Sequence, residues 1–422
     1  MVERTAKPLL TIRSAAAVGG AFAALIAIFA CIGTVLPATR IGPTLGTPGA
    51  DDFVQYWAGF RILNDGGNPY DGVRMHEVQR LAGQSSDKTV LMWNPPWLAL
   101  LLAPVLALPF SLAALCWIAL DLAMLMTIAR IAPLALNRTP LPLIASALSV
   151  IVFYPVLECI RFGQLSVFLA FRFTLFLYFV RVEWFGAAAL ALIPLTAKPH
   201  LFLLFIPPGF VWLRSLSPNP RRRFLGFASS GALTVVAITT LLWPQSIANW
   251  IASLSIPPSG PGVVAREEWK TATLANLLRT ALTSPLGESP SWPMQVIPAL
   301  AFLCTTLYFW RRNEVEWSTR APPLLCISLT TSGYGWAYDQ SLLVLCQIAL
   351  LCKAMEPHAS RNFRAMMLTL LVLVQGVALF LGTRADNAQH YYVWIPWAYL
   401  ILLMVASRKG EAHAPTERSA SA

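Results

Sequence analysis

The sequence predicts an all-α polytopic membrane protein with about a dozen helical spans. Of its 422 residues, 56% are hydrophobic and only 12% are charged. A soluble protein of this length needs far more charge to cover its surface. Apolar runs of about twenty residues, the length of a helix that crosses the hydrocarbon core, recur along the whole chain. Lys and Arg gather between these runs, as they do in the cytoplasmic segments of membrane proteins.

Twelve spans are expected. They lie near residues 15–37, 111–131, 141–160, 164–180, 185–197, 199–214, 225–243, 295–310, 321–337, 339–353, 366–382 and 391–407. The runs at 185–197 and 339–353 are short and need neighbouring residues to cross. Segment 97–109 is apolar but contains Pro104 and follows two prolines. It is either a re-entrant or half helix, or a short true span.

The distribution of Lys and Arg predicts the orientation. With the N-terminus in the cytoplasm and 97–109 not crossing, most Lys and Arg residues fall in cytoplasmic segments, including Arg221-Arg222-Arg223 and Arg311-Arg312. This distribution follows the positive-inside rule. We therefore expect a multi-pass protein of the plasma (inner) membrane with both termini in the cytoplasm. One transmembrane domain is expected over residues 1–409, followed by a polar, disordered cytoplasmic tail at 410–422.

Two long loops result on the non-cytoplasmic side, a first outer loop at 38–96 and a second at 244–294. Both contain many apolar and aromatic residues, which favours ordered loops on the membrane surface. In the first loop, apolar residues at helical spacing predict an amphipathic helix over 53–63 that lies parallel to the membrane. Asp51 and Asp52 precede this helix. They are interpreted either as N-caps or as catalytic carboxylates.

Three further polar groups lie at expected outer ends of spans. They are Gln164 with the nearby Glu158 and Arg161, Lys198 with His200, and Tyr338 with Asp339. Each group alone is typical of an interfacial anchor or a polar helix end. Because ionisable groups at membrane depth are costly, their placement on the same side as Asp52 favours a shared cavity.

Taken in order, these motifs resemble glycosyltransferase family 87, membrane enzymes of the GT-C fold that use polyprenyl-phosphate sugars. The resemblance rests on Asp52-Phe53 with Tyr56, Gly66 to Asp71, Asn94-Pro95-Pro96 with Pro104 and Pro109, Gly163-Gln164, Lys198-Pro199, and Tyr338-Asp339. Asp51 is an additional acid, and Trp93-Asn94 stands where tyrosine is common in the family. The C-terminal spans carry no family signature.

The resemblance implies a GT-C type bundle and an inverting glycosyltransferase. The donor would be a polyprenyl-phosphate sugar, with mannose expected and arabinose or glucose as alternatives, and the acceptor a glycolipid or polysaccharide on the non-cytoplasmic face. Asp52, or else Asp51, would be the general base. Residues expected to bind the donor phosphate or substrate are Lys198, His200, Arg161, Gln164, Tyr338, Asp339, Asn94 and Tyr56.

The residue types suit this chemistry. A carboxylate can take the proton of the acceptor hydroxyl, and cations can bind the departing phosphate through charge-assisted hydrogen bonds. Because a polyprenyl phosphate is already a good leaving group, no cofactor or metal ion is required. The seven cysteines show no metal-ligand spacing and are interpreted as apolar packing residues.

Other functions remain as alternatives. A transporter or flippase of lipid-linked sugars would show internal pseudo-symmetry, but the two halves of the chain differ. A non-catalytic scaffold leaves the polar helix ends unexplained. The net charge is +11, but the chain lacks the basic runs with interleaved aromatics that nucleic-acid binding needs. The expected partners are therefore the lipid-linked sugar donor, the acceptor and membrane lipids.

Asp121 and Arg172 fall in the middle of predicted spans, where an unpaired charge is expensive. An ion pair between the two helices is the simplest interpretation. A proton or ion path is the alternative.

Overall fold

The computed structural model describes residues 51–84, 87–255, 259–264, 269–284, 289–383 and 389–411, the last four of them without their side chains. This part of the chain is helical and contains no strand. The span expected at 15–37 lies outside the described residues. So does the expected tail, except that Gly410 and Glu411 continue the last helix.

Six elements of the described chain are long and apolar enough to cross a membrane. They are α5 (Phe110–Ala135), α11 (Pro218–Leu242), α14 (Pro293–Trp310), η5 (Ala337–Leu343) continued by α16 (Val344–Ala354), α17 (Arg361–Gly382), and η6 (Gln389–Tyr392) followed by α18 (Trp394–Glu411). A seventh results if α6 (Leu143–Ile151) and α7 (Tyr154–Phe162), which meet at 65°, count as one span. The expected count of twelve is therefore not reached in the described chain.

The remaining apolar runs form shorter helices and 3-10 turns. They are α4 (Trp97–Leu106), α8 (Ser166–Arg181), α9 (Phe185–Leu192), η1 (Ile193–Ala197), η2 (Pro199–Leu201), η3 (Leu203–Phe205), α10 (Ile206–Ser215) and α15 (Trp317–Thr331). Ten residues of α4 rise about 15 Å, half the thickness of the hydrocarbon core. Segment 97–109 thus forms a half helix. In these elements part of the apolar surface is buried among neighbouring helices, while residues such as Ile206 and Phe210 of α10 are exposed, and the sequence does not distinguish the two environments.

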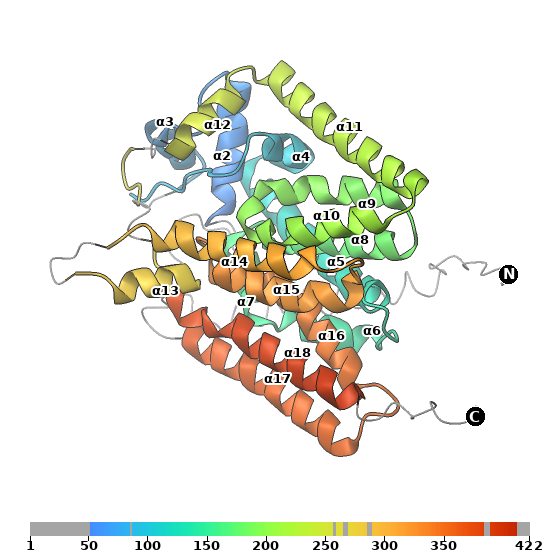
Figure 1. The fold of residues 1–422 in the computed structure, drawn as a ribbon. Coiled ribbons are helices and arrows are strands. Elements are labelled where there is room, and N and C mark those ends of the chain that lie inside the picture. The colour runs from blue at the N-terminus through green and yellow to red at the C-terminus, as the bar shows by residue number, and fades with distance from the viewer. Residues whose placement is uncertain are drawn as a thin grey trace, which may run out of the picture.

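Figure 1 shows the arrangement of the helices. Helix α11 runs along one edge of the molecule, and α17 and α18 lie side by side at the opposite edge. Helices α5, α8 and α16 pack together between them. Large apolar side chains are exposed on the peripheral helices, for example Leu241 of α11, Val372 of α17 and Leu307 of α14. Such surfaces are expected to face lipid.

The two outer loops are folded and touch one another. They contain α2 (Phe53–Asn64) and α3 (Gly72–Leu81) in the first loop, and α12 (Ser246–Ser255) and α13 (Leu274–Ala281) in the second. The Thr89 N–H donates to the carbonyl of Gly262 over 3.3 Å, and the Trp250 Nε1–H donates to the carbonyl of Trp93 over 3.3 Å. The loops therefore support each other at one end of the molecule.

The surface location expected for helix 53–63 is wrong. Nine of the twelve residues of α2 are buried, and Phe53 stacks on Trp117 of α5 at 5.7 Å. Away from the expected apolar face, Ala58 and Gly59 are also buried, and the side chain of Met92 packs where a Cβ of Gly59 would lie. Small residues allow close approach on this second side, so the helix is enclosed rather than laid on a membrane.

The ion pair expected between Asp121 and Arg172 is also wrong. Asp121 of α5 is fully buried, and neither carboxylate oxygen has a hydrogen-bond partner. The Arg172 Nη2 group of α8 instead donates to the carbonyl of Leu190 in α9 over 3.0 Å. Helix α8 contacts α5 on one side and α9 on the other. The rotation of α8, which hydropathy does not report, directs Arg172 toward α9.

Candidate active site

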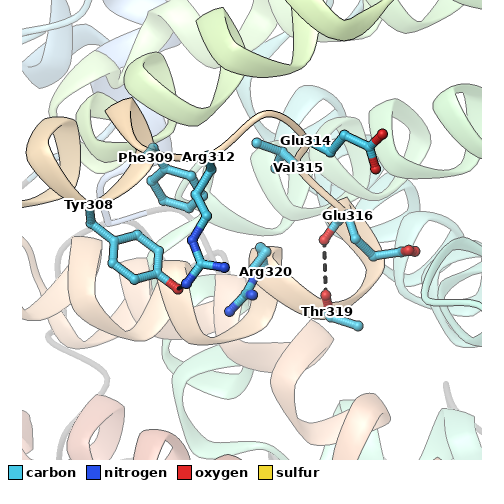
Figure 2. A pocket seen from close by; sticks show the side chains of 8 residues that line it. All are labelled: Tyr308, Phe309, Arg312, Glu314, Val315, Glu316, Thr319 and Arg320. Atoms are coloured by element: carbon cyan, nitrogen blue, oxygen red, sulfur yellow. Dashed lines mark hydrogen bonds between the residues drawn. The ribbon is translucent and has the colours of Figure 1, made fainter.

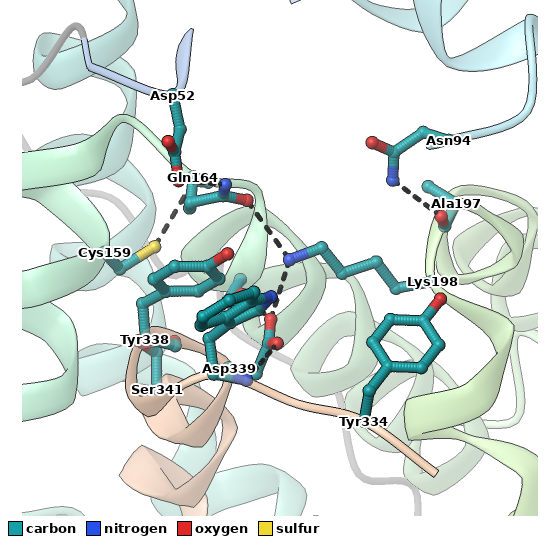
Figure 3. Close-up of polar contacts among 12 residues, drawn as sticks. Asp52, Asn94, Cys159, Gln164, Ala197, Lys198, Tyr334, Tyr338, Asp339 and Ser341 are labelled. Carbon is teal, nitrogen blue, oxygen red and sulfur yellow. Dashed lines mark hydrogen bonds and ion pairs between the residues drawn. The ribbon is translucent and has the colours of Figure 1, made fainter. Parts of the chain in front are cut away.

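Four segments that are distant in sequence meet at the end of the molecule that carries the outer loops. Asp52 immediately precedes α2, Gln164 lies in the turn between α7 and α8, Lys198 lies between η1 and η2, and Asp339 lies in η5. Figure 3 shows Gln164 between Asp52 and Lys198, with Lys198 extending toward Asp339. The structure thus brings together four polar positions that the sequence places at separate helix ends.

Gln164 connects the members of this network. Its Nε2 group donates to Asp52 Oδ2 over 2.7 Å. Its Oε1 atom accepts from the Tyr56 hydroxyl over 2.9 Å and from Lys198 Nζ over 3.2 Å. Burial raises the pKa of Tyr56 well above its usual value, so its hydroxyl remains a donor. Two donors on the oxygen and one acceptor on the nitrogen fix the orientation of the amide.

The turn that presents Gln164 depends on a glycine. Gly163 ends α7 in the left-handed conformation, with φ at 66°. This conformation is costly for a residue with a Cβ. The Gln164 N–H donates to the carbonyl of Cys159 over 2.9 Å, which closes the turn before α8 begins. The backbone therefore delivers Gln164 to the network at a fixed place.

Lys198 and Asp339 form a buried ion pair, with Nζ 2.7 Å from Oδ1. The side chain of Lys198 also lies over the ring of Tyr338, with Nζ 4.9 Å from the ring centroid. Asp339 accepts from the Ser166 hydroxyl over 2.7 Å and from the Trp336 N–H over 2.9 Å. Because its oxygens are hydrogen-bonded, Asp339 is held as a fixed counter-charge for Lys198.

Asp52 differs from Asp339 in its environment. It is half-buried and makes no capping hydrogen bond to α2, so the capping interpretation does not hold for this residue. Burial raises the pKa of the Asp52 carboxyl to about 6, the hydrogen bond from Gln164 opposes that rise, and the charge of Asp51 adds to it. Asp51 lies in the preceding turn and is also half-buried. A carboxylate with a pKa near neutrality suits proton transfer.

Two other predicted residues support the network from its edges. Asn94 donates through Nδ2 to the carbonyl of Ala197 over 2.9 Å, next to Lys198. The Tyr70 hydroxyl donates to the carbonyl of Asn94 over 2.9 Å. The first outer loop therefore fixes the backbone that precedes Lys198.

Arg161 and His200 lie beside the network, and each contacts an aromatic ring. Arg161 pairs with Glu158 at 3.3 Å and lies over the ring of Phe162. The ring of His200 stacks on Tyr334 with centroids 3.9 Å apart. Lys198 is thus the cation that contacts Gln164 and Asp339, while Arg161 and His200 flank it.

The sequence did not predict a role for Ser166, nor that Tyr338, a predicted binding residue, joins an aromatic cluster, defined as Trp93, Trp269, Tyr334, Trp336 and Tyr338. Trp269 contacts Trp93, Tyr334 and Trp336 with centroids 5.5, 5.6 and 6.0 Å apart. The cluster links both outer loops to the segment that carries Asp339. Ser166 could have been found from the sequence, because it is a hydroxyl residue two positions after Gln164. The cluster was not detectable as a whole, because Trp93 and Trp269 are far in sequence from Tyr334, Trp336 and Tyr338.

Basic residues gather at the opposite end of the molecule. Helix α8 begins at Ser166, which contacts Asp339, and rises about 22 Å to Arg181. Helix α16 likewise leads from the network to Lys353. Trp317, which is close in sequence to Arg320, contacts Phe176 of α8 and also Trp212. Trp212 in turn packs on Phe224, which follows the triple arginine. The network and these basic residues therefore lie at opposite ends of the helices.

In the part of the chain that the structure describes, no three His, Cys, Asp or Glu side chains lie together as metal ligands would. The groups available to a substrate include the half-buried carboxylates of Asp51 and Asp52, the Gln164 amide, Lys198 and aromatic rings.

A model of glycosyltransferase family 87 matches residues 93–333, more than half of the chain. The chain belongs to glycosyltransferase family 87. Membership in family 87 implies a membrane glycosyltransferase with sugar donor and acceptor substrates, and it confirms the resemblance found in the sequence. The family 87 match includes Asn94, Gln164 and Lys198, whereas Asp52 and Asp339 lie outside it. A comparison with curated proteins found no match.

Proposed function

We propose that this family 87 protein transfers a sugar, mannose as the first candidate, from a polyprenyl-phosphate carrier to a hydroxyl of a glycolipid or polysaccharide. The reaction would take place at the end of the molecule that carries the outer loops. One observation supports this proposal most strongly. Gln164 joins a carboxylate of raised pKa, Asp52, to a buried cation, Lys198. A base and a cation held side by side are what displacement of a phosphate by a hydroxyl needs.

Asp52 is the proposed general base. The acceptor oxygen attacks the anomeric carbon as its proton passes to the Asp52 carboxylate. The bond between that carbon and the phosphate oxygen breaks, and its electron pair leaves with the polyprenyl phosphate. Because attack and departure take place on opposite faces, the product is inverted at the anomeric carbon. A β-linked mannosyl donor would give an α-mannoside.

Lys198 is the proposed partner of the phosphate. Its ammonium group has three donors, and two of them point to Gln164 Oε1 and Asp339 Oδ1. The third is available to a phosphate oxygen. Asp339 would then act as a positioning residue that keeps Lys198 in place. Arg161 and His200, which flank the network, would contact the donor at its edges. The departing group is already a phosphate, so the proposal requires no nucleotide, cofactor or metal ion.

The proposal includes an orientation in the plasma membrane. The basic residues at the far end of α8 and α16 are expected in the cytoplasm, which would place Asp52 on the non-cytoplasmic side. A polyprenyl-phosphate sugar would reach Lys198 from the lipid and the acceptor from the aqueous side.

The test is transfer of radiolabelled mannose from polyprenyl-phosphate mannose by purified protein in proteoliposomes. Asp52→Asn keeps the size of the side chain and removes its basicity, so we expect transfer to fall by roughly a hundredfold or more. Asp51→Asn is the matched control and is expected to cost much less. Activity retained in Asp52→Asn but lost in Asp51→Asn would move the base by one residue. If label crosses the vesicle without forming a new glycosidic bond, the protein is a flippase and the proposal is wrong.

A further inference from the structure

A cavity of about 220 Å³ lies where α14 is joined to α15. Its polar lining includes Tyr308, Arg312, Glu314, Glu316 and Arg320 (Figure 2). Helix α14 starts beside Gly333, next to the aromatic cluster, and rises about 25 Å before it reaches this cavity. The cavity therefore lies at the opposite end of α14 from the candidate active site, and the proposed transfer reaction does not use it.

The cationic groups of this cavity are not paired with acids. Arg312 donates to the Tyr308 hydroxyl over 3.3 Å and its guanidinium lies 5.0 Å from the centre of that ring. Neither Arg312 nor Arg320 forms an ion pair with a carboxylate of the described chain. Figure 2 shows the carboxylates of Glu314 and Glu316 pointing away from the two guanidinium groups. Two guanidinium groups that face one cavity and form no ion pair with the two glutamates of its lining indicate a site for an anion.

A second cavity, of about 380 Å³, adjoins the first and shares Tyr308 and Arg312 with it. It is also lined by Leu307 and Arg311. This second cavity adds a third guanidinium group and, through Leu307, an apolar wall. Its lining therefore offers cationic groups for a charged headgroup and an apolar wall for an acyl chain.

An exposed apolar stripe on α14 leads into these cavities. Leu300, Leu303 and Leu307 are each more than half exposed, and their spacing places them on one face of the helix. Arg311 follows Leu307 by four residues and continues the same face. A lipid lying on α14 would thus bring its acyl chain along the leucines and its headgroup to the arginines.

We propose that the two cavities together bind the phosphate headgroup of an anionic phospholipid. The headgroup lies between Arg312 and Arg320, and one acyl chain follows the leucine stripe of α14. A free phosphate would satisfy the arginines but not the exposed leucines, so the combined surface favours a lipid. Basic pockets between membrane helices bind lipid headgroups in this way. Binding joins the end of α14 to the start of α15 and stabilises the connection between them.

The test uses the purified, delipidated full-length protein in neutral detergent. Retention of phosphatidylglycerol or phosphatidylcholine is measured by native mass spectrometry, and the melting temperature is recorded with each lipid. We expect the protein to retain phosphatidylglycerol preferentially. Arg312→Gln with Arg320→Gln should weaken that retention on the order of tenfold, since each basic residue near a headgroup contributes appreciably. Arg222→Gln with Arg223→Gln is the matched control, because it removes the same charge at the same end, and it should retain the lipid.

Several outcomes would overturn the proposal. Equal retention of phosphatidylcholine would exclude recognition of charge. Equal losses of lipid retention in the two double variants would indicate attraction of the lipid by the overall positive charge of this end of the molecule. A matched concentration of inorganic phosphate that raises the melting temperature of the wild-type protein as much as phosphatidylglycerol would indicate a site for free phosphate. The lipid comparisons use the wild-type protein, so they decide the question even if the variant at Arg312 and Arg320 fails to fold.

Discussion

At the scale of single residues, the amide of Gln164 arranges the two charges of the candidate active site. It donates to Asp52 and accepts from Tyr56 and Lys198. An amide can make these opposite contacts at once, whereas a carboxylate at this position could only accept. The same hydrogen bonds hold Asp52 toward Lys198 and limit the rise of its pKa. The titration of Asp52 is therefore coupled to the identity of residue 164.

This coupling predicts a pH dependence. Burial raises the pKa of Asp52 to about 6, and a general base acts only when it is ionised. We expect kcat/KM to fall about tenfold per unit below pH 6 and to be level above it. Gln164→Glu replaces the donor by a like charge and should move this limb to higher pH. If the kcat/KM of transfer does not change between pH 4.5 and 7 while the protein stays folded, Asp52 is not the base.

A second prediction separates two roles of Lys198. Lys198→Met leaves Asp339 buried without its cation, so we expect a loss of stability of about 3–5 kcal/mol as well as a loss of transfer. The double variant with Asp339→Asn removes both charges and should regain much of the stability but not the transfer. Melting temperatures and donor KM values of the two variants measure this. Recovery of transfer together with stability would mean that Lys198 is structural only.

At the scale of helices, packing determines which apolar segments face lipid and which face protein. Helix α2 is buried almost all round, while α14 exposes a stripe of leucines. The sequence predicts the first as an amphipathic surface helix and the second as a span, so hydropathy alone does not report this difference in burial. Asp121 in α5 is the polar exception in this packing, because its carboxylate is buried among apolar side chains without a hydrogen-bond partner.

Asp121 should therefore weaken the fold rather than support it. Leu has the branched shape of Asp with methyl groups in place of oxygens, so Asp121→Leu should stabilise the protein by about 1–3 kcal/mol. Arg172→Met is expected to destabilise it through loss of the contact with Leu190. Because the two residues are not paired, the effects should add in the double variant. Strongly non-additive changes in the melting temperature would indicate that Asp121 and Arg172 form an ion pair.

At the scale of the whole molecule, two ends carry different chemistry. One end carries the outer loops, the network and the aromatic cluster. The other carries Arg181, Lys353, the triple arginine and the cavities at Arg312. Basic residues gathered at one end of the helices are what the positive-inside rule predicts for the cytoplasmic side of a membrane protein.

Labelling of single cysteines tests this separation. Leu81→Cys in α3 and Asn219→Cys at the start of α11 introduce thiols at exposed positions on the two ends. In a background without the seven native cysteines, we expect a membrane-impermeant maleimide to label only Leu81→Cys in right-side-out vesicles and only Asn219→Cys in inverted ones. Labelling of both variants from one side would rule out the proposed orientation.

The sequence by itself determined the membrane class, the family and the residue types of the site. Hydropathy depends on composition along the chain, and motifs such as Gly163-Gln164 and Lys198-Pro199 are local. Both are therefore readable without a structure. The sequence also placed Asp52, Gln164, Lys198 and Asp339 on one side, because charge distribution follows the order of helices.

Only the tertiary structure decided how these residues pair and which helices are long enough to cross a membrane. Lys198 meets Asp339 across 141 positions of the chain, and Arg172 turns to α9 rather than to Asp121. Such contacts depend on the rotation and tilt of each helix, and these are set by side-chain packing between helices. Hydropathy reports only that a residue avoids water. It does not distinguish lipid from a neighbouring helix, and for that reason the sequence predicts more spans than the described residues contain long apolar helices, and it places α2 on the membrane surface.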